Sequence, residues 1–196
     1  MNYRVSFNLI LLLLFFKIGF SQTIDFFTND RLVLGVFKER TASINAGDID
    51  NDGDQDLLVA NGRHWPGQNR VFLNNGGGLF TISRPLDSQS DTSYSTELAD
   101  FDNDGDLDVA VGNDRAPNYI YINNGKGYFS RGFSFGKKNS STRNIVVSDI
   151  DDDSDLDIFI TNRGAENEIC LNDGFGLFNC SRGFGSKKDS TIDVEV

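Results

Sequence analysis

Aspartates at alternate positions form a nine-residue pattern that occurs three times, at residues 48–56, 100–108 and 149–157. Such a density of like charge is unfavourable unless a cation neutralises it. A tight loop with a carboxylate at every second position can direct several oxygens at one centre, and Ca²⁺ takes about 6–8 oxygen ligands. We therefore predict three calcium sites. The predicted ligands, at positions 1, 3, 5, 7 and 9 of the three copies, are Asp48, Asp50, Asp52, Asp54, Asp56, Asp100, Asp102, Asp104, Asp106, Asp108, Asp149, Asp151, Asp153, Asp155 and Asp157.

Each position of the pattern has an expected role. Positions 1, 3 and 5 offer side-chain oxygens, position 7 offers its backbone carbonyl, and position 9 closes the site with a carboxylate. Gly53 and Gly105 at position 6 permit the sharp turn, because glycine enters the positive-φ region without steric cost. The third copy has Ser154 at this position, which predicts a strained or weaker site.

The EF-hand, another calcium loop, does not fit the pattern. It requires a bidentate glutamate at position 12 and a helix on each side. Position 12 here is Val59, Val111 or Ile160, each within a short apolar run that is typical of a strand. Acidic turns without a metal are the remaining alternative, and they would require three copies in the same register by coincidence.

The whole chain is periodic, and not only its aspartate loops. The loops begin at residues 48, 100 and 149, and a run ending in Gly-x-Gly-x-Phe recurs at 69–80, 118–129 and 167–178. Each unit has the pattern of four short strands, one before the loop, one after it, and two around an Asn-Asn-Gly or Asn-Asp-Gly turn. No helical periodicity follows the N-terminal segment. A repeat of about 50 residues with four strands predicts an all-β fold of propeller blades, each with four antiparallel strands.

The loop and the repeat together resemble a known family. The pattern Asp-x-Asp-x-Asp-Gly-x-x-Asp, followed by an apolar strand, is similar to the FG-GAP/VCBS repeat of integrin-α-type β-propellers and of many secreted bacterial proteins. The resemblance extends over roughly residues 40–196, and Ser154 is the one departure inside the motif. It implies that calcium is bound between two strands of a blade and that the propeller serves adhesion or ligand binding.

The number of repeats is small for a closed propeller. Only about three blades are expected, whereas closed propellers have about 4–8. Residues 187–196 repeat the approach to an aspartate loop that is present at 137–147. We therefore expect an incomplete propeller, with the remaining blades or further domains missing from this chain.

The N-terminal segment has the pattern of a signal peptide. Arg4 precedes an apolar run over 5–16 and a small-x-small sequence at 19–21, so cleavage is predicted before Gln22. A membrane anchor is the alternative, but the run is short for a span of about 20 residues and Lys17 interrupts it. The predicted domains are thus a signal peptide over 1–21 and a repeat fragment over 22–196. We expect a secreted or cell-surface protein with no membrane span after cleavage.

The net charge of −11 comes largely from the aspartate loops. No basic stripe in the sequence opposes this charge, so we expect neither nucleic acid nor an anionic membrane surface as a partner. The two cysteines, Cys170 and Cys180, flank a segment that is predicted to be a hairpin. They could bridge its two arms in an oxidising compartment, but two buried free thiols remain an alternative because the turn register is not known.

One further ligand site is predicted, on the first unit. Its loop after the second strand is three residues longer than in the other units and contains His64 and Trp65, the only His and Trp of the chain. This loop is expected on the face opposite the aspartate loops, where an exposed Trp can stack on a sugar or dock a protein. The alternative is that Trp65 covers the apolar edge of its own blade.

The expected function is a calcium-binding module for an extracellular glycan or protein ligand, with no catalytic residues. The alternative is that the propeller belongs to, or itself is, a secreted polysaccharide-degrading enzyme. Outside the aspartate loops, however, no pair of acidic residues stands out as a general acid and base.

Overall fold

The computed structural model of the protein describes residues 34, 38–186, 188 and 190–195, so the predicted signal peptide and its cleavage site lie outside the described residues. The described part contains twelve β-strands and no helix, which confirms the predicted all-β class. The strands are β1 (Thr41–Gly47), β2 (Asp56–Asn61), β3 (Arg70–Asn74), β4 (Phe80–Pro85), β5 (Ser93–Ala99), β6 (Asp108–Asn113), β7 (Asn118–Asn123), β8 (Phe129–Phe135), β9 (Thr142–Ser148), β10 (Asp157–Asn162), β11 (Asn167–Asn172) and β12 (Phe178–Phe184).

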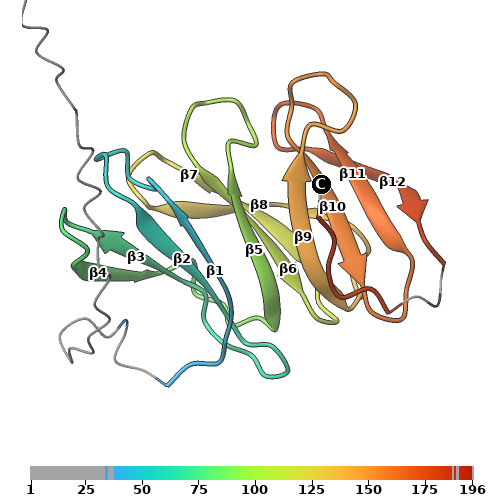
Figure 1. The fold of residues 1–196 in the computed structure, drawn as a ribbon, viewed down its shortest axis with the longest axis horizontal. Coiled ribbons are helices and arrows are strands. Elements are labelled where there is room, and N and C mark those ends of the chain that lie inside the picture. Colours follow the sequence, from blue (N-terminus) through green and yellow to red (C-terminus); the bar gives the residue numbers. More distant parts are fainter. Residues whose placement is uncertain (1–33, 35–37, 187, 189, 196) are drawn as a thin grey trace, which may run out of the picture.

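The strands form three antiparallel sheets of four strands each, and strands that are consecutive in the chain are neighbours in the sheet. We call them blade 1 (β1 to β4), blade 2 (β5 to β8) and blade 3 (β9 to β12). The blades lie next to one another in chain order, and none of the sheets closes on itself (Figure 1). The prediction of an incomplete propeller with three four-stranded blades is therefore confirmed.

The last aspartate of each loop is the first residue of the second strand of its blade. In blade 2, strand pairing begins at Asp108, opposite Ala99. After this polar start, β6 is buried along its whole length. Blade 2 lies between the other two blades, so both faces of its inner strands β6 and β7 are largely covered, whereas β8 is mostly exposed.

Two apolar cores hold the blades together, one at each junction. Leu58 of blade 1 and Val109 of blade 2 belong to the first core, while Ile120 of blade 2 and Ile158 of blade 3 belong to the second. Burial of such side chains is worth about 1.5–3 kcal/mol each, so the junctions contribute much of the stability of the fold.

The residue at position 2 of an aspartate loop inserts into the junction with the following blade. Ile49 and Phe101 are both fully buried in this way. Ile150, at the same position of the third loop, is only partly buried. Each loop is thus fixed to the core through one apolar side chain, and the third loop is held less completely than the others.

The first strands of the blades, β1, β5 and β9, belong to different sheets, and short polar side chains join them. The hydroxyls of Ser43 and Thr96 lie 3.2 Å apart, and Ser95 donates a hydrogen bond of 2.9 Å to Asn144 Oδ1. The backbone amide of Thr96 also donates to the Ser43 hydroxyl, at 3.1 Å. These bonds satisfy polar groups at a junction where the strands have no backbone ladder between them.

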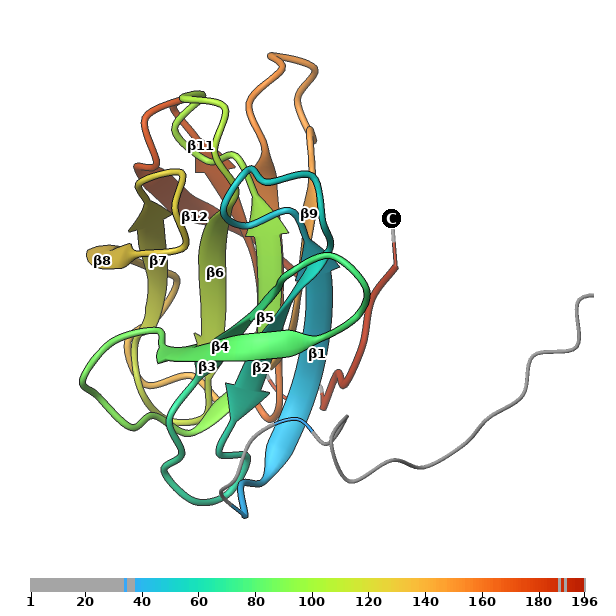
Figure 2. The same ribbon diagram turned by 90° about the vertical axis from the view of Figure 1, so that its left-hand side faces the viewer.

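The C-terminal segment 190–195 lies next to β9, where Asn144 Nδ2 donates to Asp193 Oδ1 (Figure 1). In Figure 2 it lies on the side of the molecule where β1, the first strand of blade 1, also lies. Asn167 Nδ2 donates to Thr191 Oγ1 at 2.9 Å, as Asn118 Nδ2 donates to Thr142 Oγ1 at 3.1 Å one unit earlier. The segment therefore has the place that the first strand of a further unit would have.

A disulfide joins Cys170 in β11 to Cys180 in β12. Cys170 is fully buried in the core between blades 2 and 3. The Cys180 sulfur accepts a hydrogen bond of 3.0 Å from the backbone amide of Gly136, at the end of blade 2. The bridge therefore ties the outer hairpin of blade 3 together next to the blade junction and restricts the unfolded chain.

Candidate metal sites

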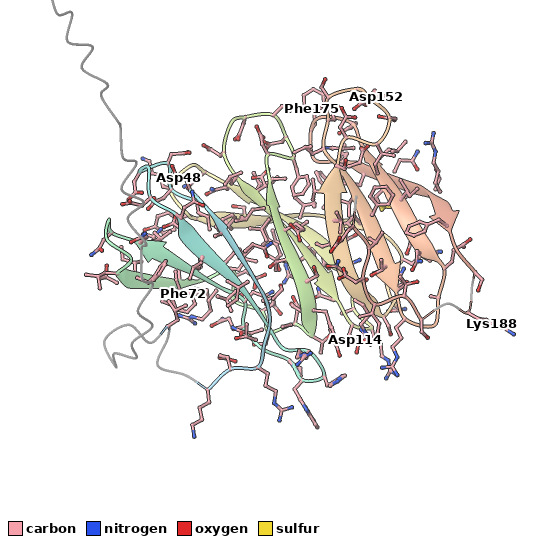
Figure 3. All side chains as sticks on the ribbon, viewed as in Figure 1. Asp48, Phe72, Asp114, Asp152, Phe175 and Lys188 are labelled. Carbon is pink, nitrogen blue, oxygen red and sulfur yellow. A yellow bond between two sulfur atoms is a disulfide. The ribbon has the colours of Figure 1, made fainter. Side chains whose placement is uncertain are left out.

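The three aspartate loops lie at the same end of the molecule, because each connects the first strand of a blade to its second. In Figure 3, Asp48 of the first loop and Asp152 of the third lie at the upper edge, and Asp114, which follows β6, lies at the lower edge. We call these the loop end and the opposite end.

Three carboxylates converge in every loop. At positions 1, 3 and 9, one oxygen of each side chain lies within 4.8 Å of the others. A cation that binds oxygen at about 2.3–2.6 Å can span such a group. The three clusters are Asp48, Asp50 and Asp56; Asp100, Asp102 and Asp108; and Asp149, Asp151 and Asp157.

The aspartate at position 1 shapes its own loop. Asp48 accepts hydrogen bonds from the backbone amides of Asp52 and Gly53, both at 3.0 Å. Asp100 and Asp149 make the same pair of bonds in their loops. The carboxylate is therefore held in place by the loop itself and is directed at the cluster without a large loss of rotamer entropy on binding.

The aspartate at position 9 ties the loop to the outer hairpin of its blade. Asp108 accepts a bond of 3.2 Å from the backbone amide of Phe101 and one of 2.8 Å from that of Asn123, at the end of β7. Asp56 and Asp157 make the equivalent pairs of bonds. Each position-9 carboxylate is fully buried, so the hairpin position and the cluster geometry depend on each other.

The aspartate at position 3 has an oxygen without a partner. Asp50 Oδ1 and Asp102 Oδ1 are buried and accept no hydrogen bond in the described part of the chain. A buried carboxylate oxygen that lacks a donor is costly unless a cation takes the donor's place. These oxygens belong to the clusters, so the residues present fit a bound Ca²⁺. Asp151, the counterpart in the third loop, is exposed.

The electrostatics of the clusters point the same way. Burial, followed by the charges of three neighbouring loop aspartates, raises the pKa of Asp50. Burial and the charge of Asp104 raise the pKa of Asp102. At Asp108 burial raises the pKa to about 7, although two backbone amides oppose the shift. Raised pKa values mean that the ionised form of these carboxylates is unfavourable when no cation is near. A divalent ion supplies the opposite charge and makes the ionised carboxylates favourable ligands.

The aspartates at positions 5 and 7 lie outside the three clusters. Position 5 stabilises the turn, as Asp104 Oδ1 accepts the Asp106 amide at 2.9 Å. The position-7 side chain faces the preceding blade, where Asn51 Nδ2 donates to Asp106 Oδ1 at 2.7 Å and Asn103 Nδ2 donates to Asp155 Oδ1 at 2.8 Å. The role of these position-4 asparagines was not predicted. Their presence in two of the three copies was the available signal.

The third loop has the same backbone conformation as the other two. Position 6 has a positive φ in all copies, 94° at Gly53, 91° at Gly105 and 77° at Ser154. Position 4 is also left-handed, with φ of 59° at Asn51. Asparagine tolerates this region, whereas serine has no such preference. The predicted strain at Ser154 thus has a counterpart in the geometry.

Comparison with known families now accounts for this arrangement. A family model of the FG-GAP-like repeat matches residues 48–111 and again 100–160, together more than half of the chain. The chain belongs to the FG-GAP-like repeat family. Each match extends from one aspartate loop into the strand after the next loop, so the FG-GAP unit includes a blade junction. A sequence comparison with curated proteins finds no match.

The FG-GAP assignment agrees with two further features. FG-GAP repeats are typically non-catalytic binding modules of extracellular or surface proteins, and the Cys170–Cys180 disulfide is a bond that persists in oxidising compartments. Within the described residues, the chain has no helix of the length and apolarity that a membrane span requires.

The predicted ligand residues of the first FG-GAP unit lie at the opposite end of the molecule. Trp65 is 61% exposed, so most of its indole faces solvent and does not cover the edge of the blade. His64 Nδ1 lies 2.8 Å from the Tyr94 hydroxyl. Trp65 and His64 are adjacent in the chain, yet Trp65 contacts Arg40 and His64 contacts Tyr94.

Proposed function

We propose that the protein is a secreted, calcium-stabilised propeller module that binds an extracellular glycan or protein ligand and has no chemistry of its own. The observation that carries the proposal is the pair of buried, partnerless oxygens at Asp50 and Asp102. Ca²⁺ at these clusters offsets carboxylate repulsion and fixes the junction between the loop and the outer hairpin. Binding free energy then becomes folding free energy.

Removal of calcium is the direct test. When the free Ca²⁺ concentration is about 100 times the dissociation constant of a site, binding adds about 2.7 kcal/mol to the free energy of unfolding. Chelation by EDTA should therefore lower the Tm by roughly 5–10 °C for each site. We would record melting curves of the full chain in CaCl₂, in MgCl₂ and in EDTA. MgCl₂ should not substitute, because Mg²⁺ demands a smaller octahedral site.

A matched variant makes the test specific. Replacement of all three position-3 residues (Asp50→Asn, Asp102→Asn and Asp151→Asn) removes three charges while it keeps side-chain size. The variant should fold in EDTA and show little response to CaCl₂, because each cluster loses an anionic ligand. A wild-type melting curve that chelation leaves unchanged would sink the calcium proposal.

Export is proposed on the N-terminal sequence alone, since residues 1–21 lie outside the described residues. The apolar run and the small-x-small site at 19–21 support it. N-terminal sequencing of the protein recovered from its native source should find Gln22 as the first residue. An intact Met1 would instead favour a retained anchor.

A further inference from the structure

The opposite end of the molecule gathers residues from all three blades. Here lie the connections from the second to the third strand of each blade, the connections between blades, and residues 38–40 before β1. Short backbone contacts hold them together: the Gly62 amide donates to the Arg40 carbonyl at 2.9 Å, and Asp114 and Arg163 form bridges to Ser141 and Ser190.

This end carries exposed positive charge, which is unexpected in so acidic a chain. Every connection from the second to the third strand presents an exposed arginine, namely Arg63, Arg115 and Arg163. None of the three forms an ion pair within the described residues. Further exposed cations at this end are Lys38, Arg40, Lys137, Lys138 and Lys188. They are far apart in the sequence, so no basic stripe is visible there.

In the part of the chain that the structure describes, four carboxylates at this end are paired with cations of the chain. Arg131 binds Asp87 at 2.6 Å and Asp91 at 3.2 Å, while Arg143 binds Asp114 at 3.0 Å. Lys137 lies 3.6 Å from Glu166. The remaining cations are therefore in excess, and the molecule has a negative loop end and a positive opposite end. Such a field attracts anions to the opposite end.

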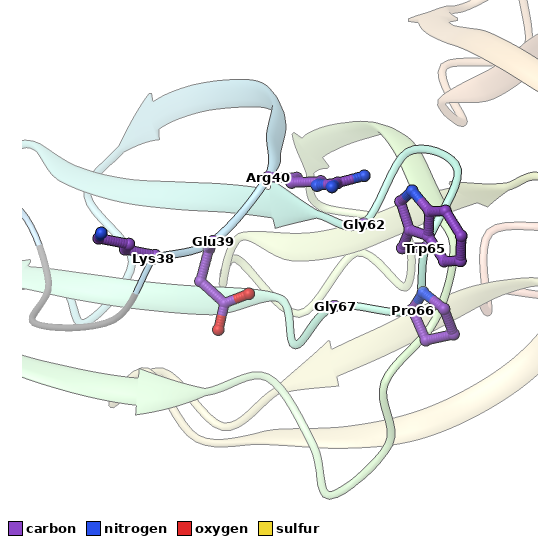
Figure 4. Close-up of a pocket in the computed structure, with 7 residues that line it drawn as sticks. All are labelled: Lys38, Glu39, Arg40, Gly62, Trp65, Pro66 and Gly67. Carbon is purple, nitrogen blue, oxygen red and sulfur yellow. The ribbon is translucent and has the colours of Figure 1, made fainter.

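The Trp65 loop adds a flat apolar surface to this charge. Arg40 lies over the indole, with its Cζ 5.5 Å from the ring centroid, and both line a shallow pocket of about 230 Å³ (Figure 4). Glu39 also lines this pocket. The loop is anchored by the paired backbone bonds between Gly67 and Asp91, at 2.9 and 3.0 Å.

We propose that the opposite end binds an acidic polysaccharide, with Trp65 and Arg40 as its anchoring site. The indole stacks on a sugar ring, the arginines pair with carboxylate or sulfate groups along the chain, and Glu39 accepts a sugar hydroxyl. Glu39 disfavours a nucleic-acid backbone in the same place, because every residue of that backbone carries a phosphate charge. The inference rests on the proposed function, for which it names the ligand class and the site.

The test uses the full chain saturated with calcium, after its melting curve has shown that it is folded. Hyaluronate, dextran sulfate, neutral dextran and a single-stranded DNA oligonucleotide are titrated by calorimetry at low and high NaCl. We expect binding to at least one of the two acidic polysaccharides, weakened by salt, and no binding to neutral dextran. The carboxylated and sulfated polymers distinguish the two possible anionic groups.

Three variants locate the site. Trp65→Ala and Arg40→Gln should each weaken binding roughly tenfold, as is typical for Trp and Arg anchors. Lys126→Gln removes one exposed charge from a turn at the loop end and should leave the affinity unchanged. Equal losses in all three variants, or equally tight binding of neutral dextran or DNA, would overturn the inference.

The two proposals fail in different ways. A protein with no calcium response would contradict the proposed function. A folded, calcium-loaded protein that binds neither acidic polysaccharide would overturn only the assignment of the opposite end.

Discussion

Ser154 shows how a single β-carbon affects the backbone of an aspartate loop. It adopts a φ of 77° where the other two copies have glycine, and a left-handed conformation costs a residue with a β-carbon about 1–2 kcal/mol. The position-6 amide makes the same hydrogen bond in both kinds of loop, since the Ser154 amide donates to Asp149 at 3.0 Å as the Gly53 amide does to Asp48. The strain is thus local to the residue.

We predict that Ser154→Gly raises the Tm of the calcium-loaded chain by roughly 2–4 °C, which corresponds to about 1 kcal/mol. Calcium affinity at the third site should rise with it. Calorimetric melting and a calcium titration check both effects. The reverse change, Gly105→Ser, should lower both quantities at the second site. If neither variant differs from the wild type, the strain does not exist.

Glu97 is a titratable residue at a blade junction rather than in a loop. Its carboxylate accepts a hydrogen bond of 3.3 Å from Asn45 Nδ2 of blade 1. Burial raises the pKa of Glu97 above its usual 4.5. The folded chain therefore binds this proton more tightly than the unfolded chain, so its contribution to stability is greatest below pH 4.5 and declines as the pH rises through the folded-state value.

We predict that Glu97→Gln stabilises the chain at pH 7 to 8 and has little effect near pH 4, because an amide has no charge to desolvate and can still accept from Asn45. Melting curves of both proteins across this pH range, each with saturating calcium, provide the check. A Tm difference that is independent of pH would show that Glu97 does not titrate in this way.

At the scale of strands and turns, the outer hairpin of one blade is bonded to the loop of the preceding blade. Asn123 Nδ2, at the end of β7, donates to the Ile49 carbonyl of blade 1 at 2.8 Å and to the Leu107 carbonyl of its own blade at 3.0 Å. Asn172 repeats this pattern at the next junction. Both donors therefore act across a junction that also contains the aspartate loop of the preceding blade.

We predict that Asn123→Ala lowers the free energy of unfolding by about 2–3 kcal/mol, because it leaves two carbonyls without a donor. The matched control is Asn74→Ala. Asn74 has the same place in blade 1 and donates one bond, to the Gln55 carbonyl at 3.2 Å, so about 1 kcal/mol or less is expected there. Urea unfolding of the two variants decides the matter, and equal losses would argue against a role at the junction.

At the scale of the whole molecule, the features that could be predicted are those whose sequence pattern lies within one repeat. The alternate aspartates, the apolar runs and the Asn-Asn-Gly turns each lie within a few residues, so the strands and the loop clusters follow from local pattern. The exact start of β6 at Asp108 is set by pairing opposite Ala99, which the apolar pattern of the sequence does not contain.

The unpredicted features all connect different repeats. Asn103 and its partner Asp155 are 52 residues apart in the chain, and Arg63, Arg115 and Arg163 belong to three different blades. Their proximity depends on how the blades pack against one another. The pattern of residues within each repeat does not reveal this packing. The two-ended charge distribution could be recognised only once every connection had been assigned to an end.

The segment 190–195 lies against blade 3 in the place of a first strand, although it belongs to none of the three sheets of the described chain. Its hydroxyl at Thr191 is already bonded to Asn167 of blade 3. The contacts that hold this segment therefore come from the neighbouring blade, as is general in repeat proteins, where each unit contacts its nearest neighbours in the chain. During synthesis the repeats can assemble one after another from the N-terminal side, so that no long-range closure has to precede a stable intermediate.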